Sequence, residues 1–399
     1  MDKRKDPYSP GAGRQPFALA GRADDIDEFE AAIERIGDGM DARPLVFYGL
    51  RGVGKTVLLR DFQKRAAANG WLTAFVEANP ERSLRDMLGD ELKLTIAEMA
   101  KPSAGESALR ALKTIISFIQ LGVDSVGHIS LGVDFSKADY SNAATGDLSG
   151  DLTVLVRDLS AACEKTGKGV AMFIDEAQDL TESDLRAINM AAHRASQETY
   201  RFVAVIAGLP TLPRILADIN SYAERLYGYR PLAGLDAESS RIALTAPSLA
   251  RGVEWENDAA SLAVSATGGF SYFIQEYGSA VWRRAEASPI TAADVENARA
   301  DAIKRLDEGF FRSRWDRASE TQKEYLRAMA ADGDGPSSTS EIAKRLGVNP
   351  TSLSPRRASL ISKGLIYSAS SGTVAFTVPQ MAQFINRQVP LGDVPFGGV

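Results

Sequence analysis

The pattern of apolar and polar positions divides the chain into an alternating part, a helical part and a short mixed module. Between residue 43 and about residue 235, short apolar runs alternate with longer segments whose apolar residues recur every three or four positions. The runs predict strands and the longer segments predict helices. The predicted strands are 45–48, 71–77, 169–174, 202–207 and 228–232, and the predicted helices are 54–68, 82–99, 151–166, 182–198 and 212–224. This alternation predicts a parallel sheet covered by helices on both faces.

The second and third predicted strands are separated by about ninety residues, which is longer than a single connecting helix requires. Within this stretch, residues 108–121 predict an amphipathic helix, and residues 129–135 alternate as in a short strand. Residues 137–150 are small and polar, and they predict a mobile loop. We therefore expect an insertion into the α/β core at about 100–150.

After residue 235 the pattern becomes purely helical and then changes again. Helices are predicted at 237–249, 256–266, 270–286 and 291–309. Residues beyond 310 predict three short helices followed by a hairpin that turns at Ser370–Gly372. Three helices and a hairpin form a winged helix-turn-helix, whose third helix enters the major groove of DNA. The expected domains are an α/β domain at 16–235, a helical domain at 236–310 and a winged helix at 311–390, with a disordered tail at 1–15 and a short tail at 391–399.

Composition and cysteine use narrow the setting of the protein. The 399 residues can hold two or three domains, and no apolar stretch approaches the roughly 20 residues of a membrane span. The N-terminal residues lack the apolar core of a secretory signal. The single cysteine, Cys163, cannot form an internal disulfide, so we expect a reducing, cytoplasmic setting without membrane contact. One cysteine and two histidines also argue against a structural zinc site.

The charge is unevenly distributed along the chain. The net charge is −6, but residues 337–388 hold six basic side chains and one acidic side chain. That segment therefore carries +5, and the rest of the chain carries −11. A basic C-terminal module on an acidic body predicts a local contact with nucleic acid.

The run from Gly49 to Thr56 fits the phosphate-binding pattern G-x-x-x-x-G-K-[ST] without a mismatch. It lies between a predicted strand and a predicted helix, where backbone N–H groups and the helix dipole can point at a polyphosphate. Lys55 is expected to reach the β- and γ-phosphates, and Thr56 to bind Mg²⁺. The residues expected to contact ATP in this segment are Gly49, Gly52, Val53, Gly54, Lys55, Thr56 and Val57.

A second element of the expected ATP site follows the strand at 169–174. The apolar run ends in two carboxylates, Asp175 and Glu176. Charge at the end of a buried strand needs a compensating partner. We expect Asp175 to hold Mg²⁺ and Glu176 to polarise the attacking water as the catalytic base.

These two motifs together resemble the AAA+ ATPases. The stretch 17–22, which ends in Gly21 and Arg22 and precedes acidic residues, is similar to a motif of the origin-recognition and replication-initiator branch, which STAND-type signalling ATPases share. The resemblance implies that Gly21 and Arg22 pack beside the adenine and that residues 236–310 form the helical lid. It covers residues 16–388 and includes the C-terminal winged helix.

Further features of that family are matched in part. Arg225 resembles the arginine finger that reaches the γ-phosphate held by a neighbouring subunit, which implies a homo-oligomer, and Arg214 is the alternative. The strand at 202–207 resembles the sensor-1 strand, but it ends at Gly208, and Thr211 is the nearest hydroxyl. The helix after Gly269 lacks the expected sensor-2 arginine, because Arg283 is its first arginine and lies more than three turns along it.

The predicted third helix of the C-terminal module supplies candidate DNA contacts. Proline removes a hydrogen bond inside a helix, so this helix is expected to begin at Ser354 with Pro355 in its first turn. Winged helices also bind proteins, so a protein partner stays open beside DNA. The candidate DNA-binding residues are Ser352, Ser354, Arg356, Arg357 and Lys363.

The sequence therefore predicts an α/β P-loop ATPase of the AAA+ type whose nucleotide state controls assembly and DNA binding. One alternative is a STAND-like signalling switch whose winged helix binds a protein. Another is an ATPase helper of a transposition or mobile-element machine, because residues 174–178 are similar to the corresponding strand end in those proteins. The absent sensor-2 arginine favours slow hydrolysis.

Overall fold

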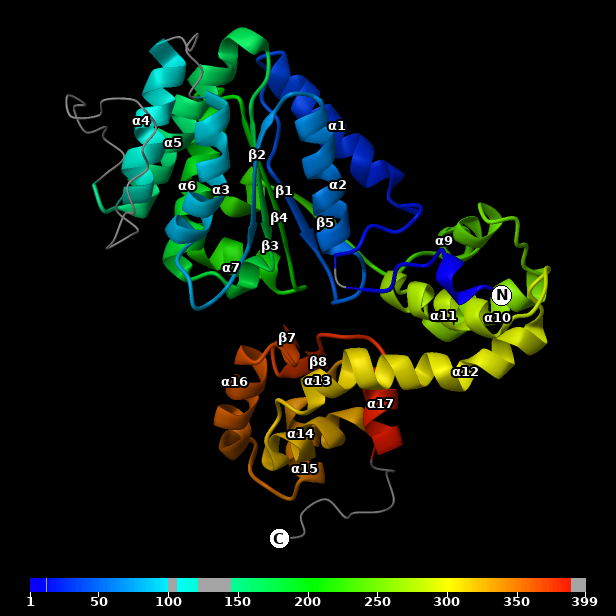
Figure 1. Cartoon of the computed structure of the whole chain (residues 1–399). Coiled ribbons are helices and arrows are strands. Elements are labelled where there is room, and N and C mark those ends of the chain that lie inside the picture. Colours follow the sequence, from blue (N-terminus) through cyan, green and yellow to red (C-terminus); the bar gives the residue numbers. More distant parts are fainter. Residues whose placement is uncertain (12, 100–105, 121–144, 389–399) are drawn as a thin grey trace. The chain divides into compact units, whose positions relative to one another are not determined.

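The computed structural model describes residues 1–11, 13–99, 106–120 and 145–388, which form two compact units (Figure 1). The first, called the sheet unit below, comprises Ala23–Tyr48 and Lys55–Pro231. The second, called the helical unit, comprises Met1–Arg22, Gly49–Gly54 and the chain from Leu232 onward. The expected phosphate-binding run therefore joins the two units, since Gly49–Gly54 packs with one and Lys55 with the other.

The sheet unit contains a five-stranded parallel sheet in the order β2–β3–β4–β1–β5. All five predicted strands are confirmed, with ends shifted by at most one residue. Every residue of β3 and β4 is buried, as continuous apolar runs require when helices cover both faces of a sheet. The strands are β1 (Leu45–Tyr48), β2 (Leu72–Glu77), β3 (Val170–Asp175), β4 (Phe202–Gly208) and β5 (Gly228–Pro231).

Helices cover both faces of this sheet (Figure 1). One face packs against α1 (Ala23–Gly37) and α2 (Lys55–Ala68), where the Phe29 and Phe62 rings stack with centroids 4.5 Å apart and Phe29 also contacts Phe173. The other face packs against α3 (Leu84–Met99), α5 (Leu148–Cys163) and α6 (Glu182–Gln197). The predicted two-sided sheet is thereby confirmed.

Two helical elements differ from the sequence prediction. The single helix predicted at 212–224 is two helices, α7 (Leu212–Ile219) and α8 (Ala223–Leu226). The chain leaves the helix at Asn220, where the backbone is extended with a φ of −142°. The pattern also fails to predict α1, although this helix contributes Phe29 to the core.

The predicted helix of the insertion is confirmed as α4 (Glu106–Gln120), which packs between α3 and α5. A buried ion pair joins α3 to α5, with the Arg85 guanidinium 2.6 Å from the Asp151 carboxylate. Arg85 also donates to the Phe118 carbonyl at the end of α4. The strand predicted at 129–135 and most of the loop predicted at 137–150 lie outside the described residues.

From Leu232 onward, the helical unit first forms four helices, at positions close to those predicted. They are α9 (Ala237–Leu249), α10 (Asn257–Thr267), α11 (Ser271–Arg284) and α12 (Ala292–Leu306). A π-helical turn, Asp307–Phe311, and α13 (Arg312–Trp315) continue from α12. Among the described helices, none has the length and apolarity needed to cross a membrane.

The C-terminal module, residues 312–388, contains the three predicted helices and the predicted hairpin. The helices are α14 (Glu320–Ala330), α15 (Thr339–Arg345) and α16 (Ser354–Ser362), and a fourth helix, α17 (Met381–Gln388), was not expected. The hairpin strands β7 (Ile366–Ser370) and β8 (Thr373–Phe376) pair antiparallel, and the short β6 (Ser337–Ser338) extends them in the order β6–β8–β7. Helix α16 begins at Ser354 with Pro355 in its first turn, as predicted.

Helices α9–α12 and the C-terminal module share a hydrophobic core. Phe311 is buried at the junction, where its ring stacks on Phe384 of α17 with centroids 5.2 Å apart and also contacts Phe273 of α11. An ion pair between Arg387 and Asp307 spans the same junction at 2.5 Å. Burial of aromatic rings at this boundary couples the two regions energetically.

The expectation of a disordered N-terminal tail is wrong for its first residues. Tyr8 is 5% exposed, and its hydroxyl donates to the Leu244 carbonyl at 2.7 Å. Asp6 accepts from the Ser279 hydroxyl, and the Trp282 indole donates to the Asp2 carbonyl. The polar composition of this segment suggested disorder. The ring of Tyr8, however, supplies buried apolar area that favours an ordered segment.

We expect Tyr8→Ala to destabilise the helical unit by about 3–5 kcal/mol, because it removes a buried aromatic ring. Tyr8→Phe is the matched control and should cost only about 1 kcal/mol, the value of one hydrogen bond. Thermal unfolding, together with limited proteolysis at residues 1–15, measures both effects.

Gly278→Ala tests the same contact from the other side, since a Cβ there lies 2.3 Å from the Tyr8 ring. It should also release the segment to protease. Equal protease resistance in all three variants and the wild type would contradict the packing.

Candidate nucleotide-binding site

The segment Gly49–Gly54 leaves β1 and leads into α2, as its strand–loop–helix pattern predicts. Gly52 and Gly54 have φ values of +88° and +96°. Side chains with a Cβ rarely adopt such angles, so glycine is required at both positions. A Cβ on Gly49 would lie 2.1 Å from the Leu232 carbonyl oxygen. The motif is therefore fixed by backbone conformation as well as by its residue types.

The first residues of α2 meet the end of β3 within the sheet unit. The Thr56 hydroxyl donates to Asp175 Oδ2 at 2.5 Å, and Lys55 is 5% exposed. Val57 lies half-buried in the first turn of the same helix. A hydroxyl and a carboxylate that converge in this way are oxygen ligands of the kind Mg²⁺ takes. Among the described residues no group of three acidic, histidine or cysteine side chains forms a metal site of its own.

Asp175 is a buried carboxylate, with 1% of its surface exposed. Burial raises its pKa above the ordinary value, and the negative charge of Glu176 raises the pKa further. The hydrogen bond from Thr56 acts in the opposite direction but does not outweigh burial. The carboxylate is therefore unfavourably placed when ionised, and a bound cation would relieve it.

Glu176 follows Asp175 in a sharp turn, with a left-handed φ of 50°. Its backbone N–H donates to Asp175 Oδ1 at 2.9 Å. Its carboxylate accepts from the Gln178 side-chain amide at 2.7 Å. The carboxylates of Asp175 and Glu176 therefore accept hydrogen bonds from different groups.

In the helical unit, carbonyl groups of the Gly49–Gly54 loop accept hydrogen bonds from two other segments. Arg22 donates to the carbonyl groups of Val53 and Ala233 at 3.0 Å each. Tyr272 at the start of α11 donates its backbone N–H to the Gly52 carbonyl at 3.2 Å. The structure therefore places Arg22 at the phosphate-binding loop. Gly21, with a φ of +67°, lies against Ser239 of α9.

The position at which the family has a sensor-2 arginine is occupied by the start of α11. Ser271 lies next to Gly54, with its hydroxyl 3.7 Å from where a Cβ would be. Arg283, the first arginine of this helix, pairs instead with Asp6 of the N-terminal segment at 3.2 Å. The sequence was expected to lack a sensor-2 arginine here. The residue of α11 that lies next to Gly54 is the uncharged Ser271.

Both arginine-finger candidates lie on the surface of the sheet unit. Arg225 is exposed on α8, and Arg214 is exposed on α7. Arginine carries a permanent planar charge that can bind phosphate oxygens in two places. The expected role of Arg225 in a second subunit's site stays a prediction.

The candidate DNA-binding cations are partly engaged inside the C-terminal module. Lys363 donates to the Arg317 carbonyl and to Gln322 Oε1, both at 2.8 Å. Arg356 lies 3.7 Å from the Glu324 carboxylate, and Arg357 is half-buried. The exposed positions of α16 are uncharged, and they are Ser354, Pro355, Ala358, Ile361 and Ser362. Ser352, just before the helix, is also exposed.

The phosphate-binding loop also contacts the C-terminal module directly. The Arg51 backbone N–H donates to the Thr377 carbonyl at 2.9 Å. The buried Thr377 hydroxyl in turn donates to the Gly364 carbonyl, just beyond α16, at 2.7 Å. These bonds connect the loop to the end of the predicted recognition helix.

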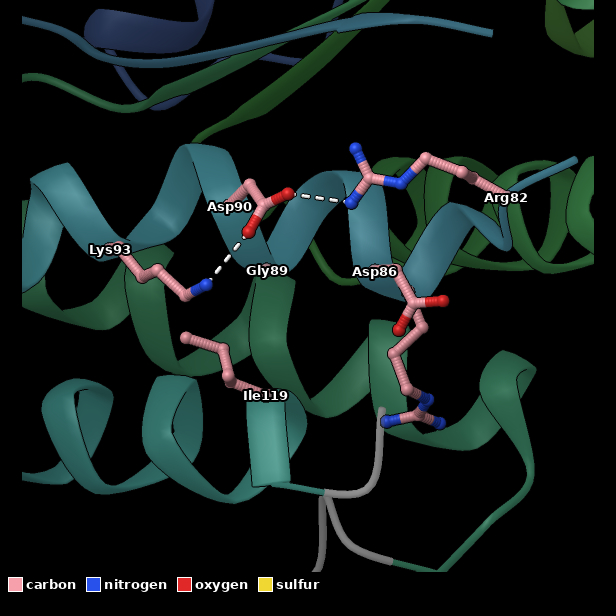
Figure 2. Close-up of a pocket in the computed structure, with 7 residues that line it drawn as sticks. Arg82, Asp86, Gly89, Asp90, Lys93 and Ile119 are labelled. Carbon is pink, nitrogen blue, oxygen red and sulfur yellow. Dashed lines mark hydrogen bonds and ion pairs between the residues drawn. The ribbon is translucent and has the colours of Figure 1, made fainter. Parts of the chain in front are cut away.

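A separate hollow of about 290 Å³ lies along α3, lined by charged side chains (Figure 2). Asp90 accepts there from both Arg82 and Lys93, and Arg85 turns toward Asp151. These cations already have acidic partners. Among the described residues that line the hollow, Gly89 is the one glycine, and its φ is not positive, unlike those of Gly52 and Gly54.

The comparison with known families agrees with the geometry. Residues 18–206 match the AAA ATPase domain model. Residues 308–385, most of the C-terminal module, match a model described as a domain of unknown function. Among curated proteins, none matches this sequence. The matched domain and the five-stranded parallel sheet confirm the predicted fold class, an α/β P-loop fold.

Several solved structures are similar to this chain, and one of them supports the same fold. A Walker-type ATPase of Pyrococcus abyssi matches with a TM-score of 0.59 and 17% identity, over 92% of this chain and 96% of that chain. The RuvB Holliday junction branch migration motor of Thermotoga maritima has a TM-score of 0.45 and 16% identity, over 90% and 95%. The Orc1 protein of Aeropyrum pernix in complex with DNA has a TM-score of 0.43 and 17% identity, over 93% and 94%. The first likeness concerns the fold alone, and the other two are too distant to support a statement about function.

Two residues of the candidate site were missed by sequence reasoning. Gln178 contacts both Glu176 and the end of β4, and Tyr272 contacts the loop. Gln178 follows Glu176 by two positions, and that spacing was the available signal. No such signal exists for Tyr272, because its hydrogen bond to the Gly52 carbonyl is made by its backbone N–H and not by its side chain.

The raised pKa of Asp175 generates a prediction about stability. The unfolded chain ionises this carboxyl near its ordinary pKa of 3.8 and the folded chain does so at higher pH. Ionisation therefore destabilises the folded state progressively as the pH rises from the first value through the second. We expect Asp175→Asn to raise the melting temperature of the nucleotide-free protein at pH 7 by a few degrees.

This gain should shrink as the pH falls toward 3.8, where the wild-type carboxyl is protonated in the folded state. Asp218→Asn, at an exposed position of α7, is the control and should change little at any pH. A lower melting temperature for Asp175→Asn at pH 7 would show that the buried charge is fully compensated.

Proposed function

We propose that the chain binds and hydrolyses ATP and that the nucleotide state controls its assembly and its binding to DNA. The observation that carries the proposal is the hydrogen bond between Thr56 at the head of α2 and Asp175 at the end of β3. It joins the two motifs that a P-loop ATPase requires. We further assign the chain to the origin-recognition and replication-initiator branch, on the motif at Gly21 and Arg22.

Binding of ATP follows from the loop and its helix. Backbone N–H groups of the segment from Gly52 to Thr56 would surround the phosphates, and Lys55 would reach the β- and γ-phosphates. Thr56 and Asp175 would hold Mg²⁺, which supplies positive charge against the phosphate oxygens when bound. A lysine that is buried at a helix N-terminus gains most from such an anionic ligand, because its own charge lacks solvent.

Hydrolysis would depend on Glu176, which accepts a proton from water or orients it. The turn at Glu176 separates its carboxylate from that of Asp175, so one can hold the cation while the other faces water. Arg225 of a neighbouring copy would complete the site by binding the γ-phosphate. Neutral groups at the start of α11 in place of a sensor arginine favour slow turnover.

We expect Glu176→Gln to bind ATP normally, to lose at least 100-fold in turnover, and to form an ATP-dependent oligomer. Loss of the water-orienting carboxylate leaves the binding contacts intact. Mass measurement with and without ATP, together with steady-state hydrolysis, tests this. Arg225→Ala in the Glu176→Gln background should weaken the oligomer.

Two further variants make that test decisive. Lys55→Ala should bind no ATP and stay unassembled. Arg214→Ala should assemble normally if Arg225 is the finger, and the reverse result would exchange their roles. A monomer under every condition would contradict the shared site.

DNA binding is proposed for residues 337–388, which carry a net charge of +5. Ser352 and Ser354 are exposed for phosphate or base contacts, while Arg356, Arg357 and Lys363 would have to turn outward from their present half-buried positions. A specific observation favours a second candidate, a protein partner: the exposed face of α16 is uncharged. The core of a protein interface is depleted in charged residues, and this face presents none.

We expect duplex DNA binding to tighten with ATP and to weaken steeply with salt, because phosphate contacts release counterions. Replacing both Arg356 and Arg357 by Ala should reduce the slope of log affinity against log salt by about two units. Arg194→Ala, on α6 and paired with Glu198, is the matched control and should leave the slope unchanged.

Binding that is indifferent to both salt and nucleotide would contradict the DNA proposal. Absence of binding at low salt would do so as well, and would favour the protein partner.

A further inference from the structure

Gln178 lies in a short 3₁₀ turn, Ala177–Asp179, immediately after the two acidic residues. Both ends of its side-chain amide are hydrogen-bonded. Nε2 donates to Glu176 Oε2 at 2.7 Å, and Oε1 accepts from the Leu209 backbone N–H at 2.9 Å. Gln178 therefore bridges the end of β3 and the residue that follows β4.

The orientation of this amide is determined by its partners. A backbone N–H can only donate, so the oxygen of the amide must face Leu209. The nitrogen is then left to face Glu176, where an ionised carboxylate accepts. One fixed backbone group thus sets the direction of a bond to the predicted catalytic carboxylate.

Gly208 makes room for the bridge. A Cβ at this position would lie 2.7 Å from Gln178 Oε1, closer than side chains tolerate. In the family that the sequence resembles, a polar sensor residue is expected near this strand end. This chain has Gly208 there instead. The space that a larger residue would occupy is filled by the Gln178 amide.

The backbone of Glu176 does not fix its carboxylate without help. Its φ of 50° is unusual for a residue with a long side chain, and such conformations persist where surrounding contacts favour them. The Asp179 N–H donates to the Glu176 carbonyl at 2.9 Å, which closes the turn. The turn fixes the main chain, and the bond from Gln178 fixes the end of the side chain.

We propose that Gln178 is a positioning residue for ATP hydrolysis, which holds the Glu176 carboxylate in register with the end of β4 in place of a polar side chain on that strand. This inference rests on the proposed ATPase function. Gln178 acts on Glu176 and not on the nucleotide, so its loss should lower kcat and leave ATP affinity nearly intact. A misplaced general base commonly costs one to two orders of magnitude in rate.

The test compares kcat with the dissociation constant for ATP in the full chain. Gln178→Met keeps the length of the side chain and removes the amide, and we expect kcat to fall about 10- to 100-fold while ATP affinity changes less than about threefold. Gln197→Met, at an exposed position at the end of α6, is the matched control and should change neither value. Thermal unfolding of each variant confirms that it is folded.

Gly208→Ala provides a second route to the same loss, because it displaces the amide without altering Gln178. It should lower kcat to a similar extent. The double variant should lose little more than either single variant, since both act on the same pair of hydrogen bonds.

Three results would overturn the inference. One is an unchanged kcat in Gln178→Met, and another is a loss of ATP affinity as large as the loss of kcat. The third is full additivity in the double variant. A wild-type chain that binds ATP without any turnover would instead contradict the proposed hydrolysis itself, and the role of Gln178 with it.

Discussion

A carboxylate placed at the end of a fully buried strand is the constraint around which the sheet unit is organised. Asp175 lies where β3 stops, with almost no solvent around it, and burial raises its pKa. Its two oxygens accept from the Thr56 hydroxyl and from the Glu176 N–H. These bonds do not fully offset the cost of the charge. Binding of a cation would offset the remainder, so the same feature that weakens the nucleotide-free protein favours a metal–nucleotide complex.

The parallel topology makes this arrangement possible. All five strands run in the same direction, so their carboxyl ends share an edge of the sheet. That edge receives the first turn of α2, the acidic pair after β3 and Leu209 after β4. Residues separated by more than a hundred positions, such as Thr56 and Asp175, therefore come within hydrogen-bonding distance. The order of the strands decides which of these segments are neighbours. Because β3 and β4 are adjacent, Gln178 after β3 can bond to Leu209 after β4.

The strands and the glycine-rich loop at Gly49–Gly54 could be predicted because their signals are local. Gly52 and Gly54 are required by backbone angles, and apolar runs mark buried strands. The spacing of Gln178 from Glu176 signalled one of its two bonds, but the other could not be predicted, because Leu209 is 31 positions away and contributes only a backbone group. The N-terminal segment was misjudged since polar residues outnumber the one ring that orders it. The start of α16 at Ser354 was predicted correctly, but the acceptors that engage Lys363 lie on other elements and gave no local signal.

The bond from the Arg51 N–H to the Thr377 carbonyl has a consequence for how the protein can be divided. Both groups belong to the main chain, so substitution of either side chain leaves the bond available. Removal of the C-terminal module, however, exposes the Arg51 N–H and takes away its acceptor. A chain cut near residue 310 would also uncover Phe311, which packs against Phe384. A chain shortened in this way therefore differs from the full chain at the Gly49–Gly54 loop, so any property measured on it reports the effect of the cut as well as the behaviour of the remaining unit.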